Sequence, residues 1–225
     1  MKPLAMKVQK KKTLLKNKQL KYAVSEANIM KKINNPFIVK LLYAFQTPTN
    51  LYLVIEHCPG GDLEYHLDQK EVFEEETAKF IAAEILLALE HLHRMKILYR
   101  DLKPGNVLID ADGHVKLADF GLAKDNMGSQ CCTFSFCGSP AYLAPEMIGK
   151  EGLTVKSDIY QLGNVLYEML VGLPPFFTSD LNELYKSISK EKLKVPDIIC
   201  TEGKDLLHKM LDKNPKTRIS IESIK

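Results

Sequence analysis

The sequence predicts an α+β chain of two unequal parts, a small sheet-rich lobe followed by a larger, mainly helical lobe. Short apolar runs typical of strands dominate up to Ile55. The turn signal Pro59-Gly60-Gly61 follows, and after it the apolar residues recur at helical spacing. At 225 residues the chain is long enough for one domain or two small lobes with a proper core.

The smaller part contains four predicted elements. Residues 4–8 form a short apolar run with one embedded lysine and predict a strand, and residues 23–33 predict a helix. Apolar runs at 38–45 and 51–55 predict two further strands. The Pro-Thr-Asn sequence at 48–50 separates them as a hairpin turn would.

The larger part begins with a predicted helix over residues 74–93. Its first three residues are glutamates, which suit a helix N-terminus, and its apolar residues recur every three or four positions. Short runs at 107–109 and 115–117, divided by Asp112-Gly113, predict a small hairpin.

Two more helices are predicted towards the C-terminus. Ser157 is expected to cap a buried helix, which Pro174-Pro175 is expected to end. Residues 204–213 predict a further amphipathic helix.

The composition is that of an ordinary soluble globular protein, with 45% hydrophobic and 26% charged residues. A net charge of +3 is too small to imply binding to nucleic acid or to a membrane surface. Most of the excess lies in a lysine-rich run at 10–21, for which a solvated helix face or loop is favoured over a targeting signal.

Neither a membrane span nor a secretory signal is predicted. No apolar stretch approaches the ~18 residues that a span requires, and the N-terminus lacks the apolar core of a signal peptide. The five cysteines are odd in number and lack paired metal-ligand spacing. Reduced thiols are therefore expected, in an intracellular protein that is cytoplasmic or nuclear.

The most informative stretch is residues 99–106, Tyr-Arg-Asp-Leu-Lys-Pro-Gly-Asn. A second motif, Asp119-Phe120-Gly121, follows it in the chain. Phosphoryl transfer needs a carboxylate that accepts the proton of the acceptor hydroxyl, and oxygen ligands that hold Mg²⁺ on the phosphates. Two surface turns rich in Asp, Asn and Pro are the alternative explanation. Further motifs in a fixed order argue against that alternative.

These motifs are Ala5-Met6-Lys7-Val8, Ser25-Glu26-Ala27-Asn28 and Ala144-Pro145-Glu146. With them, the sequence resembles the catalytic domain of eukaryotic Ser/Thr protein kinases, specifically the AGC group that includes cyclic-AMP-dependent kinase. The resemblance implies a bilobal protein-kinase-like fold with a truncated small lobe. Residues 1–58 would form this partial nucleotide-binding lobe, and residues 59–225 the lobe with the catalytic loop, activation loop and substrate site.

The resemblance assigns the chemistry of the catalytic loop. Asp101 would be the catalytic base, and Lys103 would steady the γ-phosphate of ATP during transfer. Asn106 and Asp119 would hold Mg²⁺. Lys103 followed by a proline is the Ser/Thr rather than the tyrosine-kinase form of this loop.

The nucleotide would be held by residues of both predicted lobes. Lys7, paired with Glu26, matches the lysine that contacts the α- and β-phosphates, although such a pair means little on its own because surface pairs are common. Other matching positions are Ile55 as gatekeeper, the backbone of Glu56 and Cys58 at the adenine edge, Asp62 at the ribose, and Leu108 beneath the base. A plain core strand followed by a polar turn is the alternative for this second group, and spacing alone does not choose.

Several matches imply structural roles. Glu146 and Arg218 match a buried ion pair of the family, and Asp158 matches a helix aspartate that braces the catalytic-loop backbone. Four positions match a stacked apolar spine: Met30, Leu41, Tyr99 and Phe120.

A phosphorylation site is also implied. Ser135 occupies the activating position of the AGC activation loop, where an upstream kinase would act, and Arg100 and Lys124 match the cationic partners of its phosphate. A surface serine without a role is the alternative.

The sequence departs from the family in two places. No G-x-G occurs, so the phosphate-covering loop is absent, the Lys7 strand should be an exposed sheet edge, and the chain is expected to be a fragment, a truncated gene model or a kinase derivative. Gly105 stands where AGC kinases carry a substrate-binding glutamate, whereas Asp62 and Glu168 keep two other acidic positions. A weakened preference for basic residues upstream of the acceptor is expected.

Two functional hypotheses follow. The first is an ATP- and Mg²⁺-dependent Ser/Thr kinase acting on protein substrates. The second is a truncated or catalytically weak kinase-like binding or scaffold protein, for which the absent glycine-rich loop argues.

Overall fold

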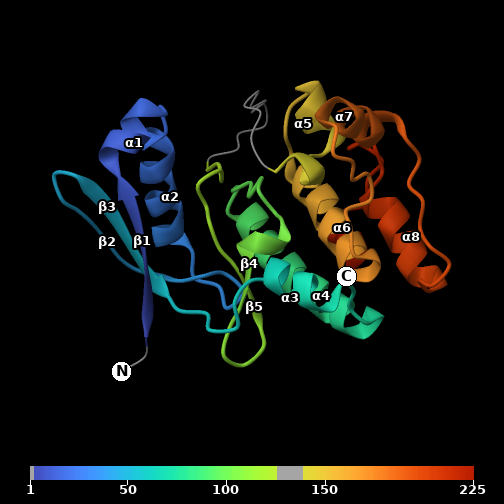
Figure 1. Cartoon of the computed structure of the whole chain (residues 1–225), viewed down its shortest axis with the longest axis horizontal. Coiled ribbons are helices and arrows are strands. Elements are labelled where there is room, and N and C mark those ends of the chain that lie inside the picture. The colour runs from blue at the N-terminus through green and yellow to red at the C-terminus, as the bar shows by residue number, and fades with distance from the viewer. Residues whose placement is uncertain (1–2, 126–138) are drawn as a thin grey trace.

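The computed structural model describes residues 3–125 and 139–225, which form a small sheet-containing lobe and a larger helical lobe. In Figure 1 the sheet and helices α1 and α2 lie on the left, and the other helices lie on the right. The predicted α+β, bilobal fold class is therefore confirmed.

The small lobe is built on a three-stranded antiparallel sheet of order β1-β3-β2. Its strands are β1 (Leu4–Lys10), β2 (Leu41–Gln46) and β3 (Asn50–Glu56). The predicted hairpin joins β2 to β3, and β1 lies at an edge of the sheet. Because strand residues alternate between faces, Lys7 points to the opposite side from Met6 and Val8, which are 54% and 52% exposed.

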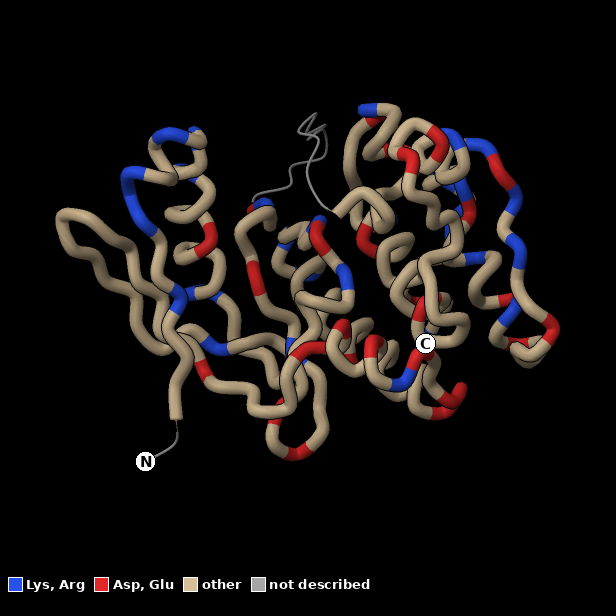
Figure 2. Tube along the Cα trace, viewed as in Figure 1, with Lys and Arg blue, Asp and Glu red and all other residues tan. Residues whose placement is uncertain are grey.

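Two helices follow β1 in the chain, α1 (Lys11–Lys16) and α2 (Leu20–Lys32). Helix α2 buries Ala23, Glu26, Ile29 and Met30, which recur at the spacing of one helix face. The lysine-rich run at 10–21, predicted as a solvated helix face or loop, extends from the last residue of β1 through α1 and the turn after it to the start of α2. Figure 2 shows basic residues gathered at this end of the lobe.

The large lobe packs around helix α6 (Val155–Val171), most of whose residues are buried. Helices α4 (Glu75–Arg94) and α8 (Thr201–Met210) pack against it. The remaining elements are α3 (Leu63–Lys70), β4 (Val107–Ile109), β5 (Val115–Leu117), α5 (Pro145–Gly149), α7 (Leu181–Lys190), α9 (Ile221–Ile224) and two short 3₁₀ turns at Pro104–Asn106 and Pro140–Tyr142. None of the described helices is both long and apolar enough to span a bilayer.

The predicted ends of α6 were wrong. Thr154 caps the helix by accepting a hydrogen bond from the Lys156 N–H, and Ser157 lies in the first turn. The helix ends at Gly172, whose φ of 93° is one that glycine adopts without strain, before the chain reaches the prolines. Helix α8 likewise begins at Thr201 rather than at 204, because the Cys200 sulfur accepts the Gly203 N–H.

Backbone hydrogen bonds hold the connection between the lobes against the large lobe. The Gly60 N–H donates to the Ile109 carbonyl at 3.0 Å, and the Ile109 N–H donates to the Gly61 carbonyl at 2.9 Å. A Cβ at Gly60 would lie 2.8 Å from the Ile109 Cβ, so only glycine allows this close approach. This contact fixes the connection between the lobes directly against the β4–β5 hairpin.

Candidate active site

The catalytic loop lies between α4 and β4, and side chains of α6 hydrogen-bond to its backbone. The Asp158 carboxylate accepts the Tyr99 N–H at 3.1 Å and the Arg100 N–H at 2.8 Å, and its Oδ2 lies 2.7 Å from His93 Nε2. Asp158 is fully buried, so these contacts are shielded from water. This is the bracing geometry that the resemblance implied for Asp158.

A second residue of α6 continues this brace and was missed from the sequence. The Gln161 Oε1 accepts the Leu102 N–H at 3.3 Å, and its Nε2 donates to the Arg100 carbonyl at 3.1 Å. Gln161 lies three residues after Asp158 and therefore on the same helix face. That spacing was the available signal.

Within the loop, Asn106 holds Asp101. The Asn106 Nδ2 donates to the Asp101 backbone carbonyl at 2.8 Å and to Asp101 Oδ2 at 3.0 Å. Burial raises the pKa of Asp101, although Lys103 and the Asn106 hydrogen bond act in the opposite direction. Asn106 therefore orients the Asp101 carboxylate, and the positive charge of Lys103 acts on it.

Asp119 follows β5 and meets the catalytic loop through the backbone. The Ala118 N–H donates to the Asn106 carbonyl at 2.9 Å, and the Gly121 N–H donates to Asp119 Oδ1 at 3.1 Å. Burial alone would raise the pKa of Asp119, but the Lys7 ammonium and the hydrogen bond from the Gly121 N–H lower it below its usual value.

Lys7 joins Asp119 to helix α2. Its Nζ lies 2.8 Å from Glu26 Oε1 and 2.9 Å from Asp119 Oδ1, so one ammonium contacts two carboxylates. Burial opposes the charge on Lys7, yet the two carboxylates raise its pKa. The predicted pairing of Lys7 with Glu26 is present, and Asp119 is brought to the same point from a distant part of the chain.

The backbone is constrained at both loops. Arg100 has a φ of 69° and Asp119 a φ of 51°, in the left-handed region that residues other than glycine rarely adopt. At Arg100 the conformation is held by Asp158 and Gln161, which bind its N–H and carbonyl. Such backbone strain is concentrated at functional sites in proteins.

The residues matched to the adenosine line the connection between the lobes. Glu56 ends β3, Cys58 follows it, and Asp62 and Leu108 form a β-bridge. The Asp62 carboxylate caps α3 by accepting the Tyr65 N–H at 2.8 Å. Burial raises the pKa of the Cys58 thiol to about 11, which keeps it protonated near neutral pH.

Two further expectations concern the frame around the site. Glu146 and Arg218 form the predicted buried ion pair, with two N–O distances of 2.7 and 2.9 Å. Tyr99 and Phe120 pack edge to face with ring centroids 5.3 Å apart, and the Tyr99 hydroxyl donates to the Ala118 carbonyl. The other spine positions, Met30 and Leu41, pack into the same hydrophobic core.

Ser135, the predicted phosphorylation site, lies outside the described residues, as do Cys131, Cys132 and Cys137. Arg100, one of its expected partners, donates from Nε to the Leu122 carbonyl at 2.7 Å. Its Nη1 is buried and has no hydrogen-bond partner among the described residues.

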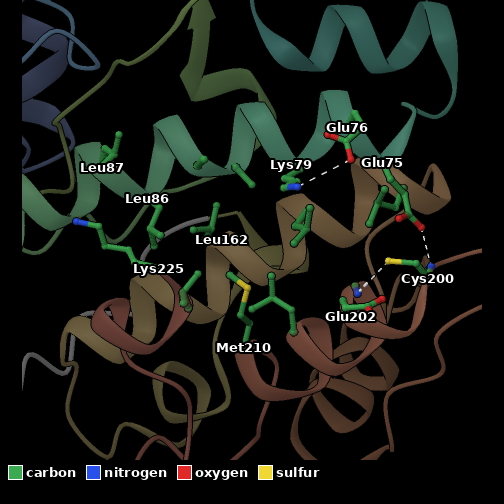
Figure 3. Close-up of a pocket in the computed structure, with 17 residues that line it drawn as sticks. Glu75, Glu76, Lys79, Leu86, Leu87, Leu162, Cys200, Glu202, Met210 and Lys225 are labelled. Carbon is green, nitrogen blue, oxygen red and sulfur yellow. Dashed lines mark hydrogen bonds and ion pairs between the residues drawn. The ribbon is translucent and has the colours of Figure 1, made fainter.

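An apolar groove of about 580 Å³ lies elsewhere, between α4, α6 and α8 (Figure 3). Its lining includes several leucines and Met210 together with charged residues such as Glu75 and Lys79, and it contains none of the site residues named above. In the described part of the chain, no group of three His, Cys, Asp or Glu side chains would hold a metal ion by itself.

The described residues thus form a sheet-containing lobe and a helical lobe, and Lys7 of the first contacts Asp119 of the second. A family model of the protein kinase domain matches residues 1–225, and the chain belongs to that family.

Curated relatives sharpen this assignment. The chain is 43% identical over 217 residues to a RAC family serine/threonine-protein kinase homolog of Dictyostelium discoideum. It is 43% identical over 216 residues to the serine/threonine-protein kinase Sgk2 of Homo sapiens, and 46% identical over 215 residues to a putative ribosomal protein S6 kinase alpha-1 of Caenorhabditis elegans. Each match covers 96% of this chain but only 49%, 59% and 27% of these relatives, respectively. The predicted resemblance to AGC-group Ser/Thr kinases is confirmed by such relatives.

Proposed function

We propose that this chain is the catalytic part of a Ser/Thr protein kinase, which transfers the γ-phosphate of ATP to serine or threonine hydroxyls of proteins. The observation that carries the proposal is the meeting of three distant segments. Lys7 from β1 contacts Asp119, and Asp119 follows the strand whose end is bonded to the loop of Asp101 and Asn106.

In this proposal Asp101 accepts the proton of the acceptor hydroxyl. The Asn106 amide fixes the Asp101 carboxylate, so its free oxygen lone pairs are held in place for the substrate. Lys103 supplies a positive charge next to Asp101 and would steady the transferred phosphoryl group.

The described residues fit a nucleotide with Mg²⁺. Neither backbone polar group of Cys58 has a hydrogen-bond partner among them, which leaves an N–H and a carbonyl for an adenine edge above Leu108. Asn106 and Asp119 offer an amide and a carboxylate oxygen, the ligands that Mg²⁺ takes beside substrate phosphates. Bound Mg²⁺ would neutralise phosphate charge, and Lys7, oriented by Glu26, would contact the α- and β-phosphates.

Regulation and substrate choice complete the proposal. A phosphate on Ser135, added by an upstream kinase, would accept a hydrogen bond from Nη1 of Arg100, which has no partner among the described residues. Full activity of a Ser135→Ala variant would remove this part. Acidic side chains at Asp62 and Glu168 favour substrates with basic residues upstream of the acceptor.

One observation favours the alternative of a catalytically weak binding protein. Strand β1 is an edge strand, and the Lys7 side chain on it remains 34% exposed. Water at this position would weaken the electrostatic contacts on which phosphoryl transfer depends.

The test is labelled phosphate transfer from Mg·ATP to a basic serine-containing peptide. Asp101→Asn should lower the rate by ~10²–10⁴-fold, which is the usual contribution of a general base, and leave nucleotide affinity nearly unchanged. Asp112→Asn, on the exposed turn of the β4–β5 hairpin, is the matched control and should keep the parent rate. Equal rates for both variants would support the binding-protein alternative.

A further inference from the structure

Positive charge is concentrated in the first part of this chain. Residues 1–58 contain eleven lysines and only two acidic residues, Glu26 and Glu56. Glu26 is buried against Lys7, and Glu56 contacts Lys116 at 3.4 Å, so both carboxylates are already paired. The whole chain has 31 basic and 28 acidic residues, so the residues after 58 are acidic in sum. The small net charge of +3 therefore results from a strongly basic small lobe and an acidic large lobe.

The highest density of positive charge lies at 10–21, from the end of β1 through α1 to the start of α2. We call its six lysines the lysine patch: Lys10, Lys11, Lys12, Lys16, Lys18 and Lys21. In the described part of the chain, no carboxylate lies within 4.0 Å of any of these ammonium groups. Lys11 donates to the Gln46 amide oxygen at 2.8 Å and Lys21 lies over the Tyr22 ring, and neither contact neutralises a charge. The patch is therefore uncompensated.

An exposed apolar side chain lies within the patch. Leu15 is 62% exposed on α1, whereas its neighbour Leu14 is buried. Lys11 and Lys12 lie four and three positions before Leu15, and Lys16 lies four positions after Lys12, so these side chains occupy adjoining parts of the helix surface. The surface thus combines a leucine with ammonium groups that are carried on flexible apolar stems.

The patch is presented by a fixed helix. The Lys11 N–H donates at 2.9 Å to the carbonyl of Thr49, in the turn between β2 and β3. The Gln19 N–H donates to the Leu14 carbonyl at 2.8 Å just after α1 ends. Hydrogen bonds therefore hold both ends of α1, and a partner would bind this surface without having to order its backbone.

From these observations we propose that the lysine patch, together with Leu15, is a docking surface for an anionic phospholipid membrane. Clusters of about four to eight basic residues on an amphipathic helix are typical of surfaces that bind acidic lipids. A lysine ammonium is a hydrated point charge, which suits the diffuse negative charge of a bilayer surface. Leu15 would enter the boundary between head groups and acyl chains, while the lysine side chains extend to the phosphates.

The composition of the patch favours a membrane over nucleic acid. Residues 10–21 contain neither an arginine nor an aromatic residue, which would supply paired hydrogen bonds to phosphates and stacking on bases. The exposed Leu15 has no role in contacts with phosphates but suits a lipid surface. The acidic large lobe would be repelled by the same membrane, so contact should be made through the end of the small lobe, where Figure 2 shows the basic segments of α1.

The test is co-sedimentation with vesicles of phosphatidylcholine, with or without phosphatidylserine. The parent chain should bind only the acidic vesicles, and less tightly as salt is raised. Lys12→Gln with Lys16→Gln should weaken binding about 10- to 30-fold, because each lysine near an acidic bilayer contributes about fivefold. Leu15→Ser should weaken binding at every salt concentration, because its contribution is hydrophobic. Lys192→Gln with Lys194→Gln removes the same charge from an exposed segment of the large lobe and should have no effect.

Three outcomes would overturn the inference. These are no binding of the parent chain to acidic vesicles at low salt, an equal loss in the two double variants, or tighter binding to a DNA duplex than to the vesicles that depends on Lys12 and Lys16. The last outcome would assign the patch to nucleic acid. Phosphate transfer to the basic peptide should be the same in the parent chain and in the variant at Lys12 and Lys16, because these lysines lie outside the candidate active site. Vesicle binding therefore tests this inference independently of the proposed kinase activity.

Discussion

The two halves of the active site are built on different physical principles. The catalytic loop rests on α6, where Asp158 and Gln161 are 0% and 1% exposed and bind backbone groups of the loop. The opposite half depends on Lys7, which lies on an edge strand and remains 34% exposed. Its partner Glu26 is buried, but Glu26 Oε2 has no hydrogen-bond partner among the described residues.

The buried network around the catalytic loop is therefore fixed by the fold, whereas the charge cluster around Lys7 would be completed by a bound ligand. A buried network that satisfies backbone groups is retained as long as the lobe is folded. A charge cluster that is partly exposed and incompletely paired is sensitive to its neighbours, and a bound nucleotide would change its balance. Mutations in the buried frame around the catalytic loop should therefore act mainly through stability, and mutations of the Lys7–Glu26 pair mainly through activity.

The largest expected effect on stability belongs to the buried ion pair of the large lobe. Arg218 donates two hydrogen bonds to Glu146, and both side chains are at most 1% exposed. Arg218→Met would leave the Glu146 carboxylate buried without its cation, which typically costs ~3–5 kcal/mol. The free energy of unfolding in urea measures this loss.

An exposed ion pair provides the control. Lys209 and Asp205 on α8 lie 2.6 Å apart, with side chains 54% and 59% exposed. Lys209→Met should cost at most ~1 kcal/mol, because water screens such a pair. Similar losses for the two variants would contradict the view that the frame beneath the catalytic loop depends on burial.

The proximity of the proposed catalytic residues could be expected from the sequence because they lie close together in it. Asp101, Lys103 and Asn106 fall within one loop, and Asp119 follows the next hairpin; their roles remain a prediction from the resemblance. The strands of that hairpin were also predicted with the bounds that the structure has.

What could not be predicted depends on packing between distant segments. In the sequence, Gln161 is simply one more polar residue of α6, and its role becomes visible only in the structure, where it binds the backbone of the catalytic loop. The close approach of the Glu64 carboxylate to Gly105 cannot be seen in the sequence, because forty residues, including all of α4, separate them in the chain. The start of α6 was misplaced because Thr154 and Ser157 are both good N-caps, and Ser157 instead donates to the buried Glu146.

The small-lobe half should show the opposite response. Glu26→Gln removes one carboxylate from Lys7 and also the cost of burying that charge, so unfolding free energy should change by no more than ~1 kcal/mol. Phosphate transfer should fall about 10- to 100-fold in kcat/KM, since one charged hydrogen bond that orients Lys7 is lost.

The matched control is Glu90→Gln on α4, where Glu90 pairs with Lys225 at 3.0 Å outside the site. Its stability change should be similarly small and its transfer rate unchanged. If Glu26→Gln lowered stability as much as Arg218→Met, the contrast between the two halves would be lost.

The smallest effect is expected where the β4–β5 hairpin meets α4. His114 Nδ1 lies 2.6 Å from Glu84 Oε1, while the Val115 N–H donates to Glu84 Oε2 at 2.8 Å. The hydrogen bond and charge of Glu84 raise the pKa of His114, and Asp110 and Asp112 on the hairpin act in the same direction. This contact belongs to the large lobe, yet His114 is half exposed, so it tests whether exposure rather than location decides the response.

The sign of the pH dependence follows from the raised pKa. Unfolded histidine titrates near ~6.5, so the contribution of the charged pair is fully present below that pH and is lost as pH rises through the higher folded value. The difference in unfolding free energy between the parent chain and His114→Gln should therefore be largest at acidic pH and shrink above neutrality. In a Glu84→Gln background this pH dependence should be weaker, because the main cause of the shift is gone. A difference that grew with pH would show that His114 is held in its neutral form, and Glu84 would then serve the hairpin only through the Val115 N–H.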